Sequence, residues 1–131
     1  MACFLIDYEN ECGRPIEGIS LVKLTGKDEV IIFYSKNATR ITMELHRELE
    51  RTKAKKDYIK VETGSPNALD FQLSSYLGAC IKENPEKKYY IVSRDKGYES
   101  VCSFWKNNGI CVERINGFSY YPDISKRTAV D

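Results

Sequence analysis

The sequence has little histidine, no paired cysteines and no long apolar run. It contains one histidine, and its five cysteines show no CxxC spacing, which argues against a zinc site. Its apolar segment 2–6 is far too short for a signal peptide or a membrane helix, so we expect no membrane partner. Because the cysteine count is odd and a signal peptide is missing, we expect the reducing cytoplasm as the compartment.

The chain also lacks an excess of positive charge and lacks the glycine-rich nucleotide loops. The formal net charge is +1, so a nucleic-acid ligand would have to be held by a local patch and with modest affinity. The absence of GxGxxG and of a Walker loop excludes dinucleotide and P-loop binding. With 131 residues and no repeats or linkers, we expect a single domain over residues 1–131, with the tail from about residue 117 left unassigned.

What the chain does have is a regular alternation of apolar runs and helical patterns. The apolar, β-branched runs that we predict to be strands are 3–6, 30–34, 58–61, 89–92 and 110–112. The predicted helices run from after Pro15 to Gly26, from after Thr39 through Leu49, from after Pro66 to Pro85, and from Gly97 to Lys106. Alternating strands and helices predict an α/β fold, a three-layer sandwich with a central parallel sheet of about five strands.

Two aspartates lie at or just beyond the ends of predicted strands. Asp7 ends the first apolar run, and Asp95 stands three residues after the fourth. In an open parallel sheet, ligands bind beyond the carboxyl ends of the strands. Each aspartate also has a structural alternative, because Asp7 could form a turn and Asp95 could cap the fourth helix.

Two further carboxylates lie on predicted helices. Asp70 falls at the flank of the apolar stripe of the third helix, although it could instead support a cap at Asn67. Glu99 lies four residues beyond Asp95, one helical turn away, where two like charges favour a cation between them. The alternative for this last pair is two solvated carboxylates at a helix N-terminus.

Together these carboxylates predict a site for a hard divalent cation. Oxygen ligands without histidine or cysteine suit Mg²⁺ or Mn²⁺, which can activate water for in-line attack on a phosphodiester. The predicted catalytic residues are Asp7, Asp70, Asp95 and Glu99, and the predicted metal ligands are Asp7, Asp70 and Asp95. Polar and basic residues at the same edge are the predicted substrate-binding set, namely Asn10, Ser35, Lys36, Asn37, Arg40, Ser93, Arg94 and Lys96.

These motifs resemble a known family. The runs from Phe4 to Asn10, from Asn67 to Asp70 and from Ile91 to Glu99 are similar to PIN-like nucleases, particularly the NYN-type branch. The resemblance covers roughly the first 115 residues and implies the strand order 3-2-1-4-5. It implies that the three aspartates coordinate metal and that Asn10 orients the first loop. Many NYN members carry an aspartate where this chain has Gly97, which puts a second metal in doubt.

The resemblance implies a metal-dependent endoribonuclease that acts on single-stranded RNA. Such domains often form dimers, so the resemblance is compatible with a homodimer. It is also compatible with a protein partner in a toxin, defence or processing system. A catalytically weak or inactive PIN-like module that binds RNA, a nucleotide or a partner is the first alternative. A haloacid-type phosphatase would need an aspartate where Glu9 stands, and a response-regulator receiver would need a lysine where Glu113-Arg114 follows the fifth strand.

Overall fold

Five parallel strands form the central sheet, in the order β3-β2-β1-β4-β5. The computed structural model describes residues 1–9, 13–62 and 65–121. The strands are β1 Ala2–Tyr8, β2 Glu29–Tyr34, β3 Lys55–Lys60, β4 Lys88–Val92 and β5 Val112–Ile115. The predicted α/β class and the strand order implied by the resemblance are both confirmed.

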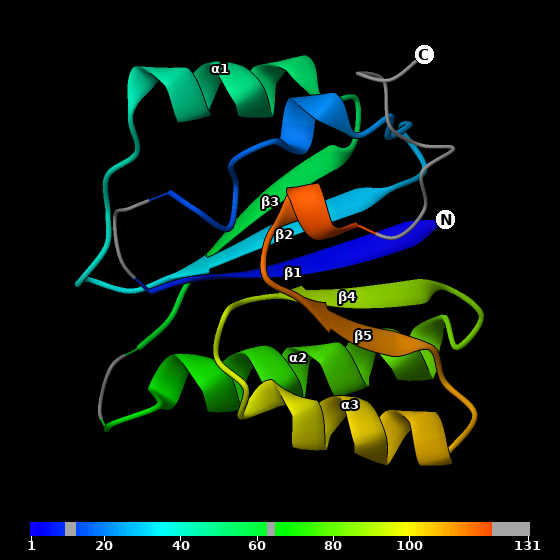
Figure 1. Cartoon of the computed structure of the whole chain (residues 1–131). Helices are drawn as coiled ribbons and strands as arrows, with labels where there is room; N and C mark the ends of the chain where they lie inside the picture. Colours follow the sequence, from blue (N-terminus) through cyan, green and yellow to red (C-terminus); the bar gives the residue numbers. More distant parts are fainter. Residues whose placement is uncertain (10–12, 63–64, 122–131) are drawn as a thin grey trace.

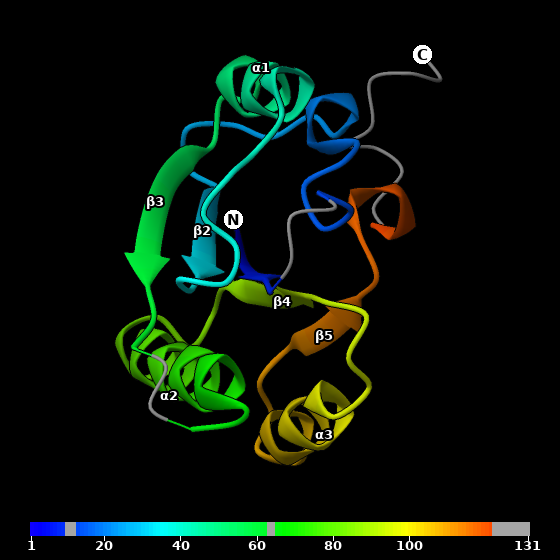
Figure 2. The ribbon, with the colours of Figure 1, turned by 90° about the vertical axis from the view of Figure 1, so that its left-hand side faces the viewer.

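Helices cover both faces of this sheet, as Figures 1 and 2 show. One layer contains α1 (Met43–Arg51) with the short 3-10 helices η1 (Ile19–Leu21) and η2 (Phe118–Tyr120). The other layer contains α2 (Ala68–Glu83) and α3 (Tyr98–Asn107). Within the described ranges, none of these helices has the length and apolar character needed to cross a membrane.

The central strand β1 is buried along its whole length and divides the core in two. Its alternate side chains point to opposite faces, as in any strand. Phe4 and Ile6 belong to the core cluster under α1, η1 and η2, whereas Cys3 and Leu5 belong to the cluster under α2 and α3. Asp7 shares the parity of Leu5, so its side chain lies on the side of α2 and α3.

The helix predicted after Pro15 is wrong. Hydrogen-bonded turns lead instead to η1, and Gly18 has a φ of 85°, which interrupts any α-helix at this point. Ile16 and Ile19 are still fully buried, so the apolar spacing reports contact with the sheet rather than a helix. The Glu48 carboxylate of α1 accepts a hydrogen bond from the backbone N–H of Ser20 at 3.0 Å and holds this segment in place.

The starts of three other elements differ by more than one residue from the prediction. The second helix begins at Met43, because Thr42 rather than Thr39 accepts the capping hydrogen bond. The third strand begins at Lys55 and is mostly exposed, because it is the outermost strand of the sheet. The fifth begins at Val112, because the backbone N–H of Ile110 still bonds back to the end of α3.

Candidate metal centre at the carboxyl edge of the sheet

The side chain of Asp7 is buried at the end of the central strand. Its Oδ2 accepts hydrogen bonds from Ser93 Oγ at 3.0 Å and from Tyr98 OH at 3.2 Å. Its Oδ1 is buried and has no hydrogen-bond partner within the described part of the chain. The residue is 4% exposed, so one carboxylate oxygen is removed from water without compensation.

Tyr98 joins Asp7 to Asp70. The tyrosine is the first residue of α3, Asp70 lies in the first turn of α2, and Tyr98 OH is 3.1 Å from Asp70 Oδ1. A phenol has a single proton, so it can donate to only one of the two carboxylates at a time. Asn67 precedes α2 but its side chain makes no capping hydrogen bond, and the Asp70 carboxylate faces the other acidic residues instead.

Glu9 completes the acidic group. One carboxylate oxygen each from Asp7, Glu9 and Asp70 lie within 4.8 Å of one another. From the sequence alone, Glu9 counts only as evidence against a phosphatase. The signal that could have identified it is its spacing, because residues two apart in an extended chain point to the same side.

Asp95 lies beside this group, in the turn between β4 and α3. Its backbone N–H donates to Ser93 Oγ at 3.1 Å, and its Oδ1 accepts from the Gly97 N–H at 2.8 Å. Its negative charge raises the pKa values of both Glu9 and Asp70. The structure therefore brings the three predicted aspartates together and adds Glu9 to them.

The cluster holds more negative charge than its surroundings compensate. Burial, followed by the charge of Glu9, raises the pKa of Asp7 to about 7. Burial is also the main cause of the raised pKa values of Glu9 and Asp70. Burial and the two neighbouring aspartates hold the pKa of Tyr98 far above its usual range, so this phenol stays protonated. Such a cluster either retains a proton or binds a cation.

The donor set fits a hard divalent cation. All the donors are carboxylate oxygens, the kind that Mg²⁺ and Mn²⁺ prefer. The buried Asp7 Oδ1 is the most specific indication, because it lacks any other partner in the described residues and would gain one from a cation. Asp7, Glu9 and Asp70 are placed to share an ion, with Asp95 next to them.

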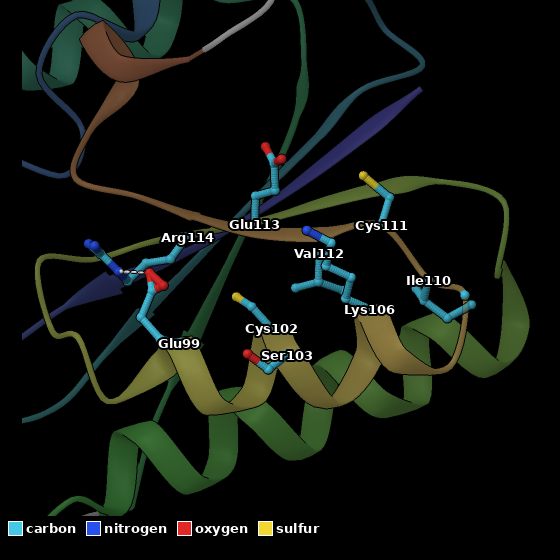
Figure 3. Close-up of a pocket in the computed structure, with 10 residues that line it drawn as sticks. Glu99, Cys102, Ser103, Lys106, Ile110, Cys111, Val112, Glu113 and Arg114 are labelled. Atoms are coloured by element: carbon cyan, nitrogen blue, oxygen red, sulfur yellow. Dashed lines mark hydrogen bonds and ion pairs between the residues drawn. The ribbon is translucent and has the colours of Figure 1, made fainter.

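Glu99 lies outside this cluster. Its Oε1 accepts a hydrogen bond from Arg114 Nε at 3.0 Å, the contact drawn as a dashed line in Figure 3. Arg114 Nη1 also donates to the Ser93 carbonyl at 2.9 Å and to Asn116 Oδ1 at 2.6 Å. Glu99 therefore supports the end of β4 through an arginine, and the helical spacing that suggested a pair with Asp95 did not reveal that partner.

The predicted substrate-binding residues lie around the cluster in different ways. Ser35 and Asn37 line a pocket of about 390 Å³ together with Glu9. The Ser93 hydroxyl is engaged by Asp7, and Asn10 lies outside the described residues. The side chains that are exposed at the ends of β2 and β4 are Lys36, Arg40, Arg94 and Lys96.

Arg14, which is not among the residues predicted from the sequence, also borders the acidic cluster. With Arg94 it lines a pocket of about 360 Å³ that includes Asp7, Glu9 and Asp95. Arg14 does not follow the carboxyl end of a predicted strand, so its position in the sequence gives no indication that it lies near the site.

A comparison with protein families identifies the domain that carries this site. A family model described as the PIN domain matches residues 1–115, a range that contains all the acidic residues described above. The chain matches no curated protein and no solved structure. The match leaves the phosphatase and receiver interpretations without support.

Proposed function

The chain belongs to the PIN domain family, and we propose that it is a metal-dependent endoribonuclease of the NYN-type branch that cuts single-stranded RNA. PIN domains are generally nucleases and typically use divalent metal ions, and an acidic triad of the kind they need is present. The observation that carries the proposal is the buried Asp7 carboxylate. Its Oδ1 has no partner in the described structure, and the carboxylate is grouped with those of Glu9 and Asp70.

We assign Asp7, Asp70 and Asp95 as ligands of Mg²⁺ or Mn²⁺, and we add Glu9 on the geometry. When bound there, a divalent ion lowers the pKa of a coordinated water and offsets charge on the phosphate oxygens. No covalent nucleophile is needed from the protein, because the residues supply position and charge.

The protein orients Asp7 for this role. Ser93 Oγ and Tyr98 OH both lie within hydrogen-bond distance of Oδ2, whereas Oδ1 is buried and has no hydrogen-bond partner among the described residues. Because Tyr98 stays protonated, it remains a donor over the whole working pH range. Because the pKa of Asp7 is raised to about 7, a cation held there would compete with a proton near neutral pH.

The test is cleavage of a fluorescently labelled single-stranded RNA in Mn²⁺ or Mg²⁺. We expect Asp7→Asn and Asp95→Asn to lower the rate by at least about 100-fold, as follows from losing several kcal/mol of charge stabilisation. Asp28→Asn is the matched control, because it changes a buried aspartate far from the cluster. Undiminished cleavage by either site variant, with the fold checked by circular dichroism, would overturn the proposal.

A catalytically weak RNA-binding module is the second candidate. Gly97 favours it, because this position carries an aspartate in many NYN members that the chain resembles. The same experiment distinguishes the two functions: the module would bind the RNA and leave it intact at every Mn²⁺ concentration.

A further inference from the structure

Two arginines separate the acidic cluster from a second pocket. Arg14 and Arg94 line the 360 Å³ pocket that contains Asp7, Glu9 and Asp95. The same two arginines line a neighbouring pocket of about 470 Å³. The remaining residues of this second pocket, called the arginine pocket below, are Glu17, Gly18, Asn116, Gly117 and Ser119.

The two arginines are not engaged within the described structure. Both side chains are exposed, and neither makes a hydrogen bond or an ion pair with a described residue. Arg114 at the same end of the sheet is different. It is paired with Glu99 (Figure 3), and its Nη1 donates to the Ser93 carbonyl and to Asn116 Oδ1. Arg114 therefore has a structural role, whereas Arg14 and Arg94 have their guanidinium groups available.

The backbone holds Arg14 in this position. Gly13 has a φ of +75°, which strains any residue with a side chain, and a Cβ there would also press on the Leu45 side chain of α1, so this turn favours glycine. The Gly13 carbonyl accepts hydrogen bonds from the N–H groups of Ile16 and Glu17. On the other side, a Cβ at Gly117 would be 3.3 Å from the Arg14 carbonyl, which shows how closely this turn approaches the end of β5.

The turn after β4 places Arg94 in the same way. Its neighbours Ser93 and Asp95 are joined by the hydrogen bond from Asp95 N–H to Ser93 Oγ, and Ser93 is held by Asp7 and Arg114. Arg94 thus stands between two residues whose positions the metal centre itself requires.

This arrangement suits a chain of phosphates. Four carboxylates repel a polyanion, so a substrate backbone needs compensating positive charge close to the point of cleavage. Arginine matches phosphate oxygens with two parallel N–H donors, and Asn116 adds an amide to the same pocket.

We propose that the arginine pocket binds the RNA phosphate that neighbours the one at the acidic cluster, with Arg14 and Arg94 as its ligands. The proposal rests on the ribonuclease function proposed above and deepens it, because it makes the enzyme recognise a backbone rather than an isolated phosphodiester. Glu17 lines the same pocket and opposes the ligand, so its charge limits the affinity.

Binding of a labelled eight-nucleotide single-stranded RNA tests the pocket without cleavage. Fluorescence anisotropy is measured in the Asp7→Asn background with Mg²⁺ present, at salt concentrations from 50 to 200 mM. We expect Arg14→Ala and Arg94→Ala each to raise Kd roughly fivefold to tenfold and to flatten the slope of log K against log[salt] by about 0.7, one phosphate contact on a single strand. Glu17→Gln should lower Kd, and Arg51→Ala, which removes an exposed arginine that lines neither pocket, should leave it unchanged.

Kinetics in the otherwise unmodified protein supply the second readout. The kcat/KM of Arg14→Ala for the oligonucleotide should fall at least fivefold more than its kcat/KM for bis(p-nitrophenyl) phosphate, which has a single phosphodiester and no neighbour. Equal losses of kcat/KM on both substrates would overturn the proposal that the arginine pocket binds a phosphate. An unchanged Kd and salt slope in both arginine variants would overturn it as well. If the unmodified protein binds RNA through the arginines but cuts neither substrate, the pocket stands and the ribonuclease function fails.

Discussion

Two aspartates in the part of the chain that the structure describes are almost fully buried, and they differ in what surrounds them. Asp28, 1% exposed, lies just before β2; its Oδ1 accepts from the Ala2 N–H and its Oδ2 from the Thr25 N–H, both at 2.8 Å. Asp7, 4% exposed, lies at the opposite end of β1, where it faces Glu9 and Asp70. The first carboxylate is matched by backbone donors, and the second is crowded by other carboxylates.

The difference separates a structural carboxylate from the one that we propose to be functional. A buried charge is tolerated when hydrogen-bond donors satisfy it, and Asp28 meets that condition. Asp7 meets it at one oxygen only, and its neighbours add repulsion. The fold maintains an unfavourable arrangement at the carboxyl edge that a cation would relieve, which is typical of functional sites.

The largest expected effect is that the same substitution acts in opposite directions at these two positions. Without metal at pH 8, Asp7→Asn should stabilise the fold by as much as about 4 kcal/mol, because the wild type must ionise a carboxyl whose pKa is about 7. Asp28→Asn should destabilise it by roughly 1–3 kcal/mol, because its amide cannot accept both backbone hydrogen bonds. Urea unfolding of the two variants measures both changes, and a shift of the same sign in each would break the comparison.

The pH dependence sharpens the same contrast. The pKa of Asp7 is higher in the folded state than its ordinary value of 3.8, so the folded state binds more protons between about pH 4 and pH 7. Metal-free wild type should therefore lose stability as the pH rises through this window, and Asp7→Asn should lose much less. Mn²⁺ should restore the melting temperature of the wild type and of Asp28→Asn but not that of Asp7→Asn. Equal Mn²⁺ shifts in all three proteins would contradict a metal centre here.

Tyr98→Phe should have the next largest effect. The Tyr98 hydroxyl holds the pKa of Asp7 down, so its removal should move the pH midpoint of Mn²⁺ binding upward. Cleavage should fall roughly tenfold, as for a lost charge-assisted hydrogen bond of about 1.5 kcal/mol. Tyr89→Phe is the control, since its hydroxyl lies away from the cluster and donates to the carbonyl of either Cys80 or Asn84. If Tyr89→Phe moves the pH midpoint equally, Tyr98 has no special role at the centre.

Glu99→Gln should have the smallest effect. The Glu99 side chain is 54% exposed and pairs with Arg114, so breaking the pair should cost less than about 1 kcal/mol. Cleavage should stay within roughly threefold of the wild type, as expected for a residue that acts through Arg114. Loss of cleavage as severe as that of Asp95→Asn would return Glu99 to the catalytic role that its helical spacing suggested.

The limits of sequence reasoning are clear at particular residues. Continuous apolar runs predicted β1, β2 and β4 well, because a strand buried on both faces leaves a strong local signal. The apolar spacing after Pro15 led to the wrong prediction of a helix. Buried turns with Gly18 at positive φ can also place apolar residues at helical intervals. Glu9, Tyr98 and Arg14 were missed as site residues because each is defined by a partner from another segment.

By itself, the sequence determined the α/β class and the presence of carboxylates near the carboxyl ends of the strands. It could do so because periodicity and residue type are local properties. Only the tertiary structure decided which carboxylates share a site, which one is buried with an unpartnered oxygen, and that Glu99 belongs to Arg114 instead. The reason is that burial and the interaction between charges depend on what packs around a side chain. At Asp7 those neighbours come from α2, β4 and α3, and they become adjacent only when the sheet forms.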